Sequence, residues 1–434
     1  MRHTLSSLQW GIFIFASIIV APLSVGHAFG MSAAEITGLL QRTFFIMGIA
    51  SLLQGFFGHR LPLLNGPAGL WWSVFLMFAG FVTGSGDGAQ IILRSLELGL
   101  LISGALFIGI SLFRWMDHVK KLFTPAVTGS YLLLLVCQLS GPFMKGMLGV
   151  GYENASAVIP KVAIAALATL IFSVLLARSR NHWLSSYSVL ISIAFGWILF
   201  AVLGIAKPIT SAGAAWFSLP HVLVWGAPAF NLGVVITSIF TAFLLMANMV
   251  ASINVVADVS EHTSNANVYN RSGIVMGINQ ALTGLFSAVG GVPMSSAAGF
   301  IATTKIKERL AFLIGSALVT IISLFPQLMA FFASIPMPVG YATIFLSISS
   351  LLGLALRQFR AILQEERQVF LVGFSLMAGF GAMFVPEQAW AGMPNALTSV
   401  MNNGLVVGVL VCIVMEQIAK LRAGSKETRN DVSA

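Results

Sequence analysis

Charged residues are scarce in this sequence. Only 9% of the 434 residues are Asp, Glu, Lys or Arg, whereas 57% are hydrophobic. A soluble globular domain carries roughly 25% charged residues, so this shortage excludes an ordinary soluble protein and indicates a chain that lies in a lipid bilayer. The net charge of +9 does not indicate a nucleic-acid-binding protein, because the basic residues lie in short loops between apolar segments.

Cysteine is also rare. Cys137 and Cys412 are the two cysteines, and each lies inside an apolar segment, which excludes a framework of paired structural cysteines. The sequence contains no HExxH pair, no nucleophile elbow and no phosphate-binding loop. We therefore expect no enzymatic activity, no cofactor and no bound metal.

Acidic residues are missing from the middle of the apolar segments. All 14 Asp and Glu residues lie in loops, in tails or near segment ends. A proton-coupled carrier keeps an ionisable residue within the membrane, and Glu97 with Arg94, near the outer end of the fourth segment, is the closest candidate. A charged pair facing the lipid headgroups is the simpler interpretation. Coupling to a proton, to a sodium ion or to neither is left open.

Long apolar runs are what the sequence has in abundance. A spanning helix needs about 20 apolar residues, and on that measure the chain divides into about 14 segments. The first seven are 7–29, 37–58, 62–82, 95–113, 119–140, 158–178 and 183–206. The second seven are 231–256, 271–291, 293–304, 309–334, 338–356, 368–385 and 399–419.

Two of these segments are interrupted. The Gly- and Pro-rich run 58–69 leads into segment three, and Gly290-Gly291-Val292-Pro293, followed by small and hydroxyl residues, leads into segment ten. Open backbone at membrane depth is tolerated only where it lines a protein cavity, and in transporters such breaks mark the substrate site. The breaks predict a short extended stretch and a half-helix in each segment.

The loops give the orientation. With the N-terminus in the cytoplasm, 18 of the 23 basic residues fall on the inner side, which is the bias that the positive-inside rule requires. The basic residues left on the outer side are Arg42, Arg94, Lys145, Lys161 and Lys207. The sequence therefore predicts a multi-pass protein of the cytoplasmic membrane with both termini inside, and a disordered tail at 423–434.

The two halves of the chain also have similar sequence patterns. Each half carries one break at its third segment, and Pro125 and Pro338 open corresponding segments five and twelve. Seven spans per half is an odd number, so the second copy must be inverted in the membrane. The predicted fold is an all-α membrane protein of two inverted seven-segment repeats, with short extended stretches in segments three and ten.

The motifs resemble those of the nucleobase:cation symporter-2 family, which contains the xanthine/uracil permeases and the nucleobase–ascorbate transporters. The resemblance is carried, in order along the chain, by Leu8-Gln9-Trp10 with Pro22, by Leu52-Leu53-Gln54 with Gly58 and Arg60-Leu61-Pro62, by Gly284-Leu285-Phe286 with Pro293, and by Ile335-Pro336-Met337-Pro338-Val339.

The resemblance implies a core domain that holds the base and a gate domain beside it, in a homodimer. The core would comprise residues 1–118 and 231–335, and the gate residues 119–230 and 336–422. The implied substrate site lies between the two breaks, beside segments one and eight.

The chain departs from the family at that site. Alignment of segment eight puts Asn248 where the family has a glutamate and Ser252 at the polar position four residues on. In the second break, Gly299 and Phe300 stand where the family has Glu or Gln followed by Asn. Both midplane carboxylates are absent, so this would be a divergent member.

Candidate substrate-binding residues follow from this alignment. An amide such as that of Asn248 offers both donors and an acceptor to a base edge, although it could equally bond between helices. The helix starts at Ala68 and Gly69 and at Ala298 and Gly299 would present backbone amides. The remaining candidates are Ser252, Phe300, Ser17 and Trp71, for which packing or bonding within the helix is the alternative.

Three functions remain open on the sequence alone. The first is a permease that imports a nucleobase, a purine such as xanthine, uric acid or hypoxanthine, with a proton symport mechanism as one form. The second is a small-anion carrier of the same fold, of the sulfate or bicarbonate kind. The third is a ligand sensor that does not transport.

Overall fold

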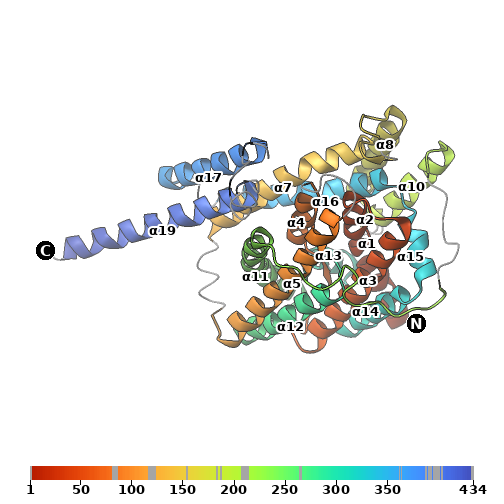
Figure 1. The fold of residues 1–434 in the computed structure, drawn as a ribbon. Helices are drawn as coiled ribbons and strands as arrows, with labels where there is room; N and C mark the ends of the chain where they lie inside the picture. The colour runs from red at the N-terminus through yellow and green to blue at the C-terminus, as the bar shows by residue number, and fades with distance from the viewer. Residues whose placement is uncertain are drawn as a thin grey trace. The chain divides into compact units, whose positions relative to one another are not determined.

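The computed structural model describes residues 2–80, 87–115, 124–152, 155–181, 184–185, 188–206, 215–262, 266–360, 362, 364–386, 389, 393, 401 and 404–431. Helices dominate it (Figure 1). The first half contains α1 (Arg2–Ile18), α2 (Val20–Ala28), α3 (Ala33–Phe56), β1 (Asn65–Pro67), α4 (Gly69–Gly80), α5 (Asp87–Leu112), α7 (Pro125–Met147), α8 (Pro160–Ala177) and α10 (Ser188–Val202).

The second half begins with the longest helix. It contains α11 (Leu232–Ser260), α12 (Ala266–Leu285), β2 (Gly291–Pro293), α13 (Ser296–Thr304), α14 (Arg309–Ser323), α15 (Pro326–Ala333), α16 (Met337–Arg360), α17 (Glu366–Phe384) and α19 (Gly404–Asp431). Helix α19 thus includes most of the tail for which the sequence predicts disorder.

Within the described residues, seven helices are long and apolar enough to cross a membrane, or eight if α14 and α15 form one bent span. Several of the observed helices are shorter than the predicted segments in which they lie. Helix α4 has 12 residues and α13 has 9, because each follows a strand, and α14 and α15 meet at an angle of 88° where Pro326 starts a new helix. The full set of fourteen spans therefore remains a prediction.

The chain forms two compact units. The first comprises residues 1–116 and 141–347, and the second comprises 117–140 and 348–434. This division puts α8 and α10 in the first unit, whereas the sequence interpretation grouped them with the gate domain. The division of the chain into core and gate domains stays a prediction.

The first unit is built from closely packed helix pairs. Helix α12 packs along α5, α14 packs on α1 and α3, and α11 packs on α5 (Figure 1). Glycines allow the closest approach: a Cβ on Gly104 of α5 would lie 2.7 Å from the carbonyl oxygen of Gly277 on α12. Small residues at such crossings let helix backbones approach in membranes.

In the second unit, α17 packs against α19. A Cβ on Gly379 of α17 would lie 2.8 Å from the Gly404 carbonyl oxygen, so a glycine again sets the approach. The hydroxyl of Thr124 donates a 2.6 Å hydrogen bond to the buried carboxylate of Glu416 on α19. This polar contact joins the start of the unit to its last helix.

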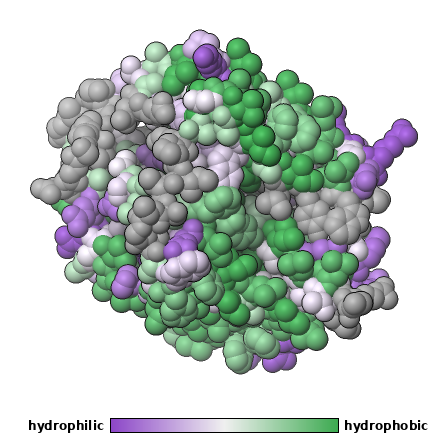
Figure 2. Space-filling model, turned by 90° about the vertical axis from the view of Figure 1, so that its right-hand side faces the viewer, coloured by the Kyte–Doolittle hydropathy of each residue, from purple (hydrophilic) through white to green (hydrophobic). Residues whose placement is uncertain are grey.

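The surface is suited to lipid. The face drawn in Figure 2 is largely apolar, with hydrophilic residues in smaller groups. Large aliphatic side chains on α8, such as Ile164 and Leu175, are more than half exposed. Exposed apolar surface on helices of this length is what a bilayer requires.

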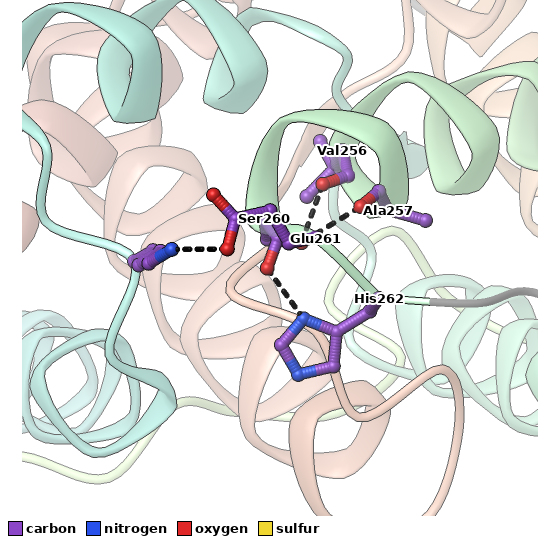
Figure 3. Close-up of polar contacts among 6 residues, drawn as sticks. Val256, Ala257, Ser260, Glu261 and His262 are labelled. Atoms are coloured by element: carbon purple, nitrogen blue, oxygen red, sulfur yellow. Dashed lines mark hydrogen bonds and ion pairs between the residues drawn. The ribbon is translucent and has the colours of Figure 1, made fainter.

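Helix α11 has a well-defined end. Glu261 takes a left-handed conformation with φ of 60°, and the Ser260 hydroxyl bonds back to Val256 and Ala257 while the Ser260 carbonyl contacts the His262 ring (Figure 3). Lys307 donates a 2.8 Å hydrogen bond to Glu261, and this bond lowers the pKa of the Glu261 carboxyl. The pair is exposed, so it adds little stability.

Candidate functional site

The two breaks meet in the first unit. Strands β1 and β2 pair antiparallel, with Gly66 opposite Val292 and Pro67 opposite Gly291. The pairing continues beyond the strands, because the Ala68 amide donates to the Gly290 carbonyl at 2.8 Å and the Met294 amide donates to the Leu64 carbonyl at 2.9 Å. The backbone that the breaks remove from helices is therefore bonded between them, which satisfies groups that lipid could not.

A glycine makes this pairing possible. A Cβ on Gly290 would lie 2.2 Å from Cδ1 of Trp71, so the indole packs directly on the backbone of the second break. Trp71 itself is completely buried and also lies edge-on to Phe75. This placement favours packing over contact with a substrate as the role of Trp71.

Each strand leads into a short helix with small residues at its start. Ala68 is buried and Gly69 is half-buried, and a Cβ on Gly69 would meet nothing within 4 Å. On α13, Ala298 is buried and Gly299 is exposed, and a Cβ on Gly299 would also meet nothing within 4 Å. Open space thus lies beside both helices, whose positive dipole ends favour carbonyl or anionic groups.

Helix α11 packs against α4, β2 and α13 and carries the two polar candidates. Asn248 is exposed on the surface of the first unit, and Ser252 is buried. The Ser252 hydroxyl donates to Oδ1 of Asn248 at 3.3 Å, so it bonds to the amide and not to its own backbone. Because Asn248 lies mid-span, its amide needs a polar partner beyond Ser252 to be tolerated there.

The other candidates serve packing in this structure. Phe300 is buried and stacks on Phe13, with ring centroids 4.5 Å apart, and its ring also lies 4.4 Å from that of Trp10. The Ser17 hydroxyl bonds back to the Phe13 carbonyl at 2.8 Å. Phe300 therefore packs against α1 and Ser17 bonds within α1, which leaves their predicted contact with substrate untested.

Part of the recognised motif ties helices together. The Gln54 amide donates to the Ser272 carbonyl at 2.9 Å, and the Arg271 guanidinium donates to the Gly58 carbonyl at 2.7 Å. These bonds connect the end of α3, just before the first break, to the first turns of α12. The motif around Gln54 and Gly58 thus ties the end of α3 to the start of α12.

One group of residues corrects the sequence interpretation. The sequence interpretation places Glu97 at an outer segment end facing headgroups and Arg42 on the outer side. Both are instead buried inside helices, Glu97 with 0% and Arg42 with 6% exposure. Helix α5 begins at Asp87, eight residues before the expected start of segment four. The polar residues in its first turns are typical of a loop, so the sequence pattern places Glu97 at a segment end.

These two charges meet at Ser287. Its hydroxyl donates to the Glu97 carboxylate, and its carbonyl accepts from Arg42 Nε at 3.1 Å. Ser287 lies between α12 and the second break, with φ of +48°. A buried carboxylate thus lies beside the break after all, although on α5 and not on α11 or α13.

The comparisons with known proteins agree with this geometry. A family model described as the permease family, that of the xanthine and uracil permeases, matches residues 1–388. The chain is 41% identical over 428 residues to "Putative purine permease YwdJ" of Bacillus subtilis (strain 168), with 96% of each chain covered. It is 26% identical over 432 residues to the "Xanthine permease" of the same organism, with 98% of this chain and 95% of that protein covered.

Solved structures give the fold. The transmembrane domain of the cyanobacterial bicarbonate transporter BicA matches with a TM-score of 0.62 at 17% identity, covering 96% of this chain and 97% of that one. SLC26A9 matches with a TM-score of 0.65 at 12% identity, covering 95% of this chain and 65% of that one. On the family match, this chain is a multi-pass membrane protein that belongs to the xanthine/uracil permease family, whose members are permeases and not enzymes.

Proposed function

We propose that this protein imports a nucleobase, a purine such as xanthine, uric acid or hypoxanthine, across the cytoplasmic membrane by proton symport. The pairing of the two breaks beside α11 is the observation that supports it most directly. Family membership and the purine permease and xanthine permease names of the relatives support the substrate class.

The proposed site lies beside the starts of α4 and α13. The Asn248 amide would bond a base edge that carries both donors and acceptors, with Ser252 fixing its orientation through the 3.3 Å bond. Backbone amides in the first turns at Gly69 and Ser296 have no partner within their helices and would bond ring carbonyls. The space beside Gly69 and Gly299 would admit a flat ring.

The proposal extends to the whole assembly. We propose two inverted seven-span repeats with both termini in the cytoplasm, divided into core and gate domains and assembled as a homodimer. The antiparallel pairing of one strand from each half supports the inverted repeat. Transport would proceed by motion of the core against the gate.

Uptake of labelled xanthine, uric acid, hypoxanthine, guanine, adenine and uracil into proteoliposomes, with and without an inward proton gradient, tests the function. We expect saturable uptake of a purine that the gradient stimulates. Uptake of bicarbonate or sulfate, and of no base, would instead identify a small-anion carrier. Binding of a base without any flux would identify a sensor.

Asn248 gives a sharper test. We expect Asn248→Ala to weaken uptake by about tenfold or more, because losing a hydrogen bond to a buried polar group changes the free energy by about 1–3 kcal/mol. Thr241→Val is the matched control, since that hydroxyl bonds back to the Thr237 carbonyl of the same helix. Asn248→Glu should keep base binding, whereas an anion carrier should lose binding when a negative charge enters its site.

A further inference from the structure

Glu97 lies deep in the membrane-spanning part of the first unit. It is ten residues from the start of α5, which is about 15 Å along a helix and thus close to the middle of an apolar layer of about 30 Å. The side chain has no exposed surface. A carboxyl group at this depth is a functional-site hypothesis by default, because its burial is otherwise unfavourable.

Its carboxylate is only partly satisfied. The Ser287 hydroxyl donates to Oε1, while Oε2 has no hydrogen-bond partner among the described residues. The Trp225 backbone amide also faces the carboxyl group. A carboxyl oxygen without a partner is costly when charged and can carry a proton at less cost.

Two positive charges lie near the Glu97 carboxyl group. Those that face it are Arg42 from α3 and Arg94 from its own helix. Arg42 Nε donates to the Ser287 carbonyl, and Arg94 Nε donates to the Ala227 carbonyl at 2.5 Å. Positive charge nearby favours the carboxylate, and complete burial favours the acid. These opposing influences are what a group that binds and releases protons needs.

Ser287 connects this carboxyl group to both breaks. Its hydroxyl also accepts from the Val224 amide at 2.9 Å, so it is held between Glu97 and the segment 215–231. Three residues further on, the Gly290 carbonyl accepts from the Ala68 amide, which directly precedes α4. A proton on Glu97 removes the negative charge to which the Ser287 hydroxyl donates, which weakens that hydrogen bond and so alters the contacts of the backbone that enters the second break.

We propose that Glu97 is the proton-binding group of this transporter, and that it replaces the carboxylates absent from α11 and α13. This rests on the proposed function. The carboxylate takes one proton from the outer solution to become a carboxylic acid, the base binds, and the proton leaves to the inner solution after the base; no other bond forms or breaks. Arg42 is a positioning residue that holds Ser287 and balances the carboxylate.

A pH jump followed by infrared difference spectroscopy on the purified protein in lipid tests proton binding without reference to any substrate. We expect a protonated-carboxyl band in the wild type that is missing in Glu97→Gln and kept in Glu416→Gln. Glu416 is the matched control, because it is also buried but bonds Thr124 in the second unit. Glu97→Asp, which keeps a carboxyl group, should keep a shifted band.

Uptake then tests coupling. Glu97→Gln should abolish the stimulation by the proton gradient and keep exchange of labelled for unlabelled base, whereas Glu416→Gln should keep both. A carboxyl band that survives in Glu97→Gln, or stimulation that survives there, would overturn the proposal. If the wild type transports no base, the proposed function fails, and the infrared band still decides whether Glu97 takes up a proton.

Discussion

His59, in the loop between α3 and β1, is a buried histidine with only 3% of its surface exposed. Its Nδ1 accepts from the Leu61 amide at 3.0 Å, which leaves the proton of the neutral ring on Nε2. Burial, together with the positive charges of Arg271 from α12 and Arg309 from α14, lowers the pKa of His59 to about 3. The ring therefore stays neutral at physiological pH.

Acid should destabilise the protein through this residue. The pKa of His59 when folded lies below the unfolded value of about 6.5, so the neutral ring stabilises the fold above that pH and the stabilisation is lost as pH falls toward 3. Between pH 7 and 5 we expect a loss of about 1–2 kcal/mol in the free energy of unfolding. His59→Asn keeps an acceptor near Nδ1 and does not titrate, so it should lose less.

Thermal unfolding in detergent at pH 7 and pH 5 measures this difference. His221→Asn is the control, because His221 is exposed in the segment 215–231 and its replacement should leave the acid sensitivity unchanged. Equal acid sensitivity of the wild type and His59→Asn would show that His59 is not the group responsible.

At the scale of elements, the space beside α4 and α13 can be tested with single methyl groups. Gly69→Ala and Gly299→Ala add a Cβ that meets no atom of the protein within 4 Å. If a base occupies that space, each variant should weaken binding by about tenfold, because overpacking costs roughly 1–3 kcal/mol. Stability should be unchanged or higher, since alanine is the better helix former by about 1 kcal/mol.

Gly109→Ala is the matched control on α5, where an added Cβ also meets nothing within 4 Å. It should leave binding of the base unchanged. Equilibrium binding of labelled base, measured beside thermal unfolding, separates the two effects. Unaltered binding in both Gly69→Ala and Gly299→Ala would move the substrate away from the helix starts.

The elements also show how far the sequence could predict this structure. The two breaks were predictable, because runs such as Gly290 to Pro293 cannot continue a helix in lipid, and they form paired strands. The burial of Glu97 inside a helix was not predictable from the sequence. The average hydropathy along the chain places the polar turns from Asp87 to Arg94 outside the membrane. The burial of Glu97 depends on Arg42 and Ser287, which are distant in the sequence and meet it only through helix packing.

At the scale of the whole molecule, the first unit places two sites at opposite ends of α11. The segment 215–231 precedes the start of α11 and bonds the end of α12, since the Leu223 amide donates to the Leu285 carbonyl at 2.7 Å. Lys307 instead bonds Glu261 just beyond the other end of α11. With 29 residues, α11 is about 43 Å long, which is enough to put these two sites on opposite sides of a bilayer.

Labelling with a membrane-impermeant maleimide tests that orientation. In a background where Cys137 and Cys412 are replaced by serine, we expect Trp216→Cys to react in intact cells and Lys307→Cys to react only after permeabilisation. Trp216 is 77% exposed, so access does not limit its reaction. An odd number of spans puts two positions on opposite faces of the membrane. If the cysteines at positions 216 and 307 react from the same side, the predicted number of spans between them is therefore wrong by one. The reversed pattern would keep the fold and invert the protein, which would make the basic loops external against the positive-inside rule.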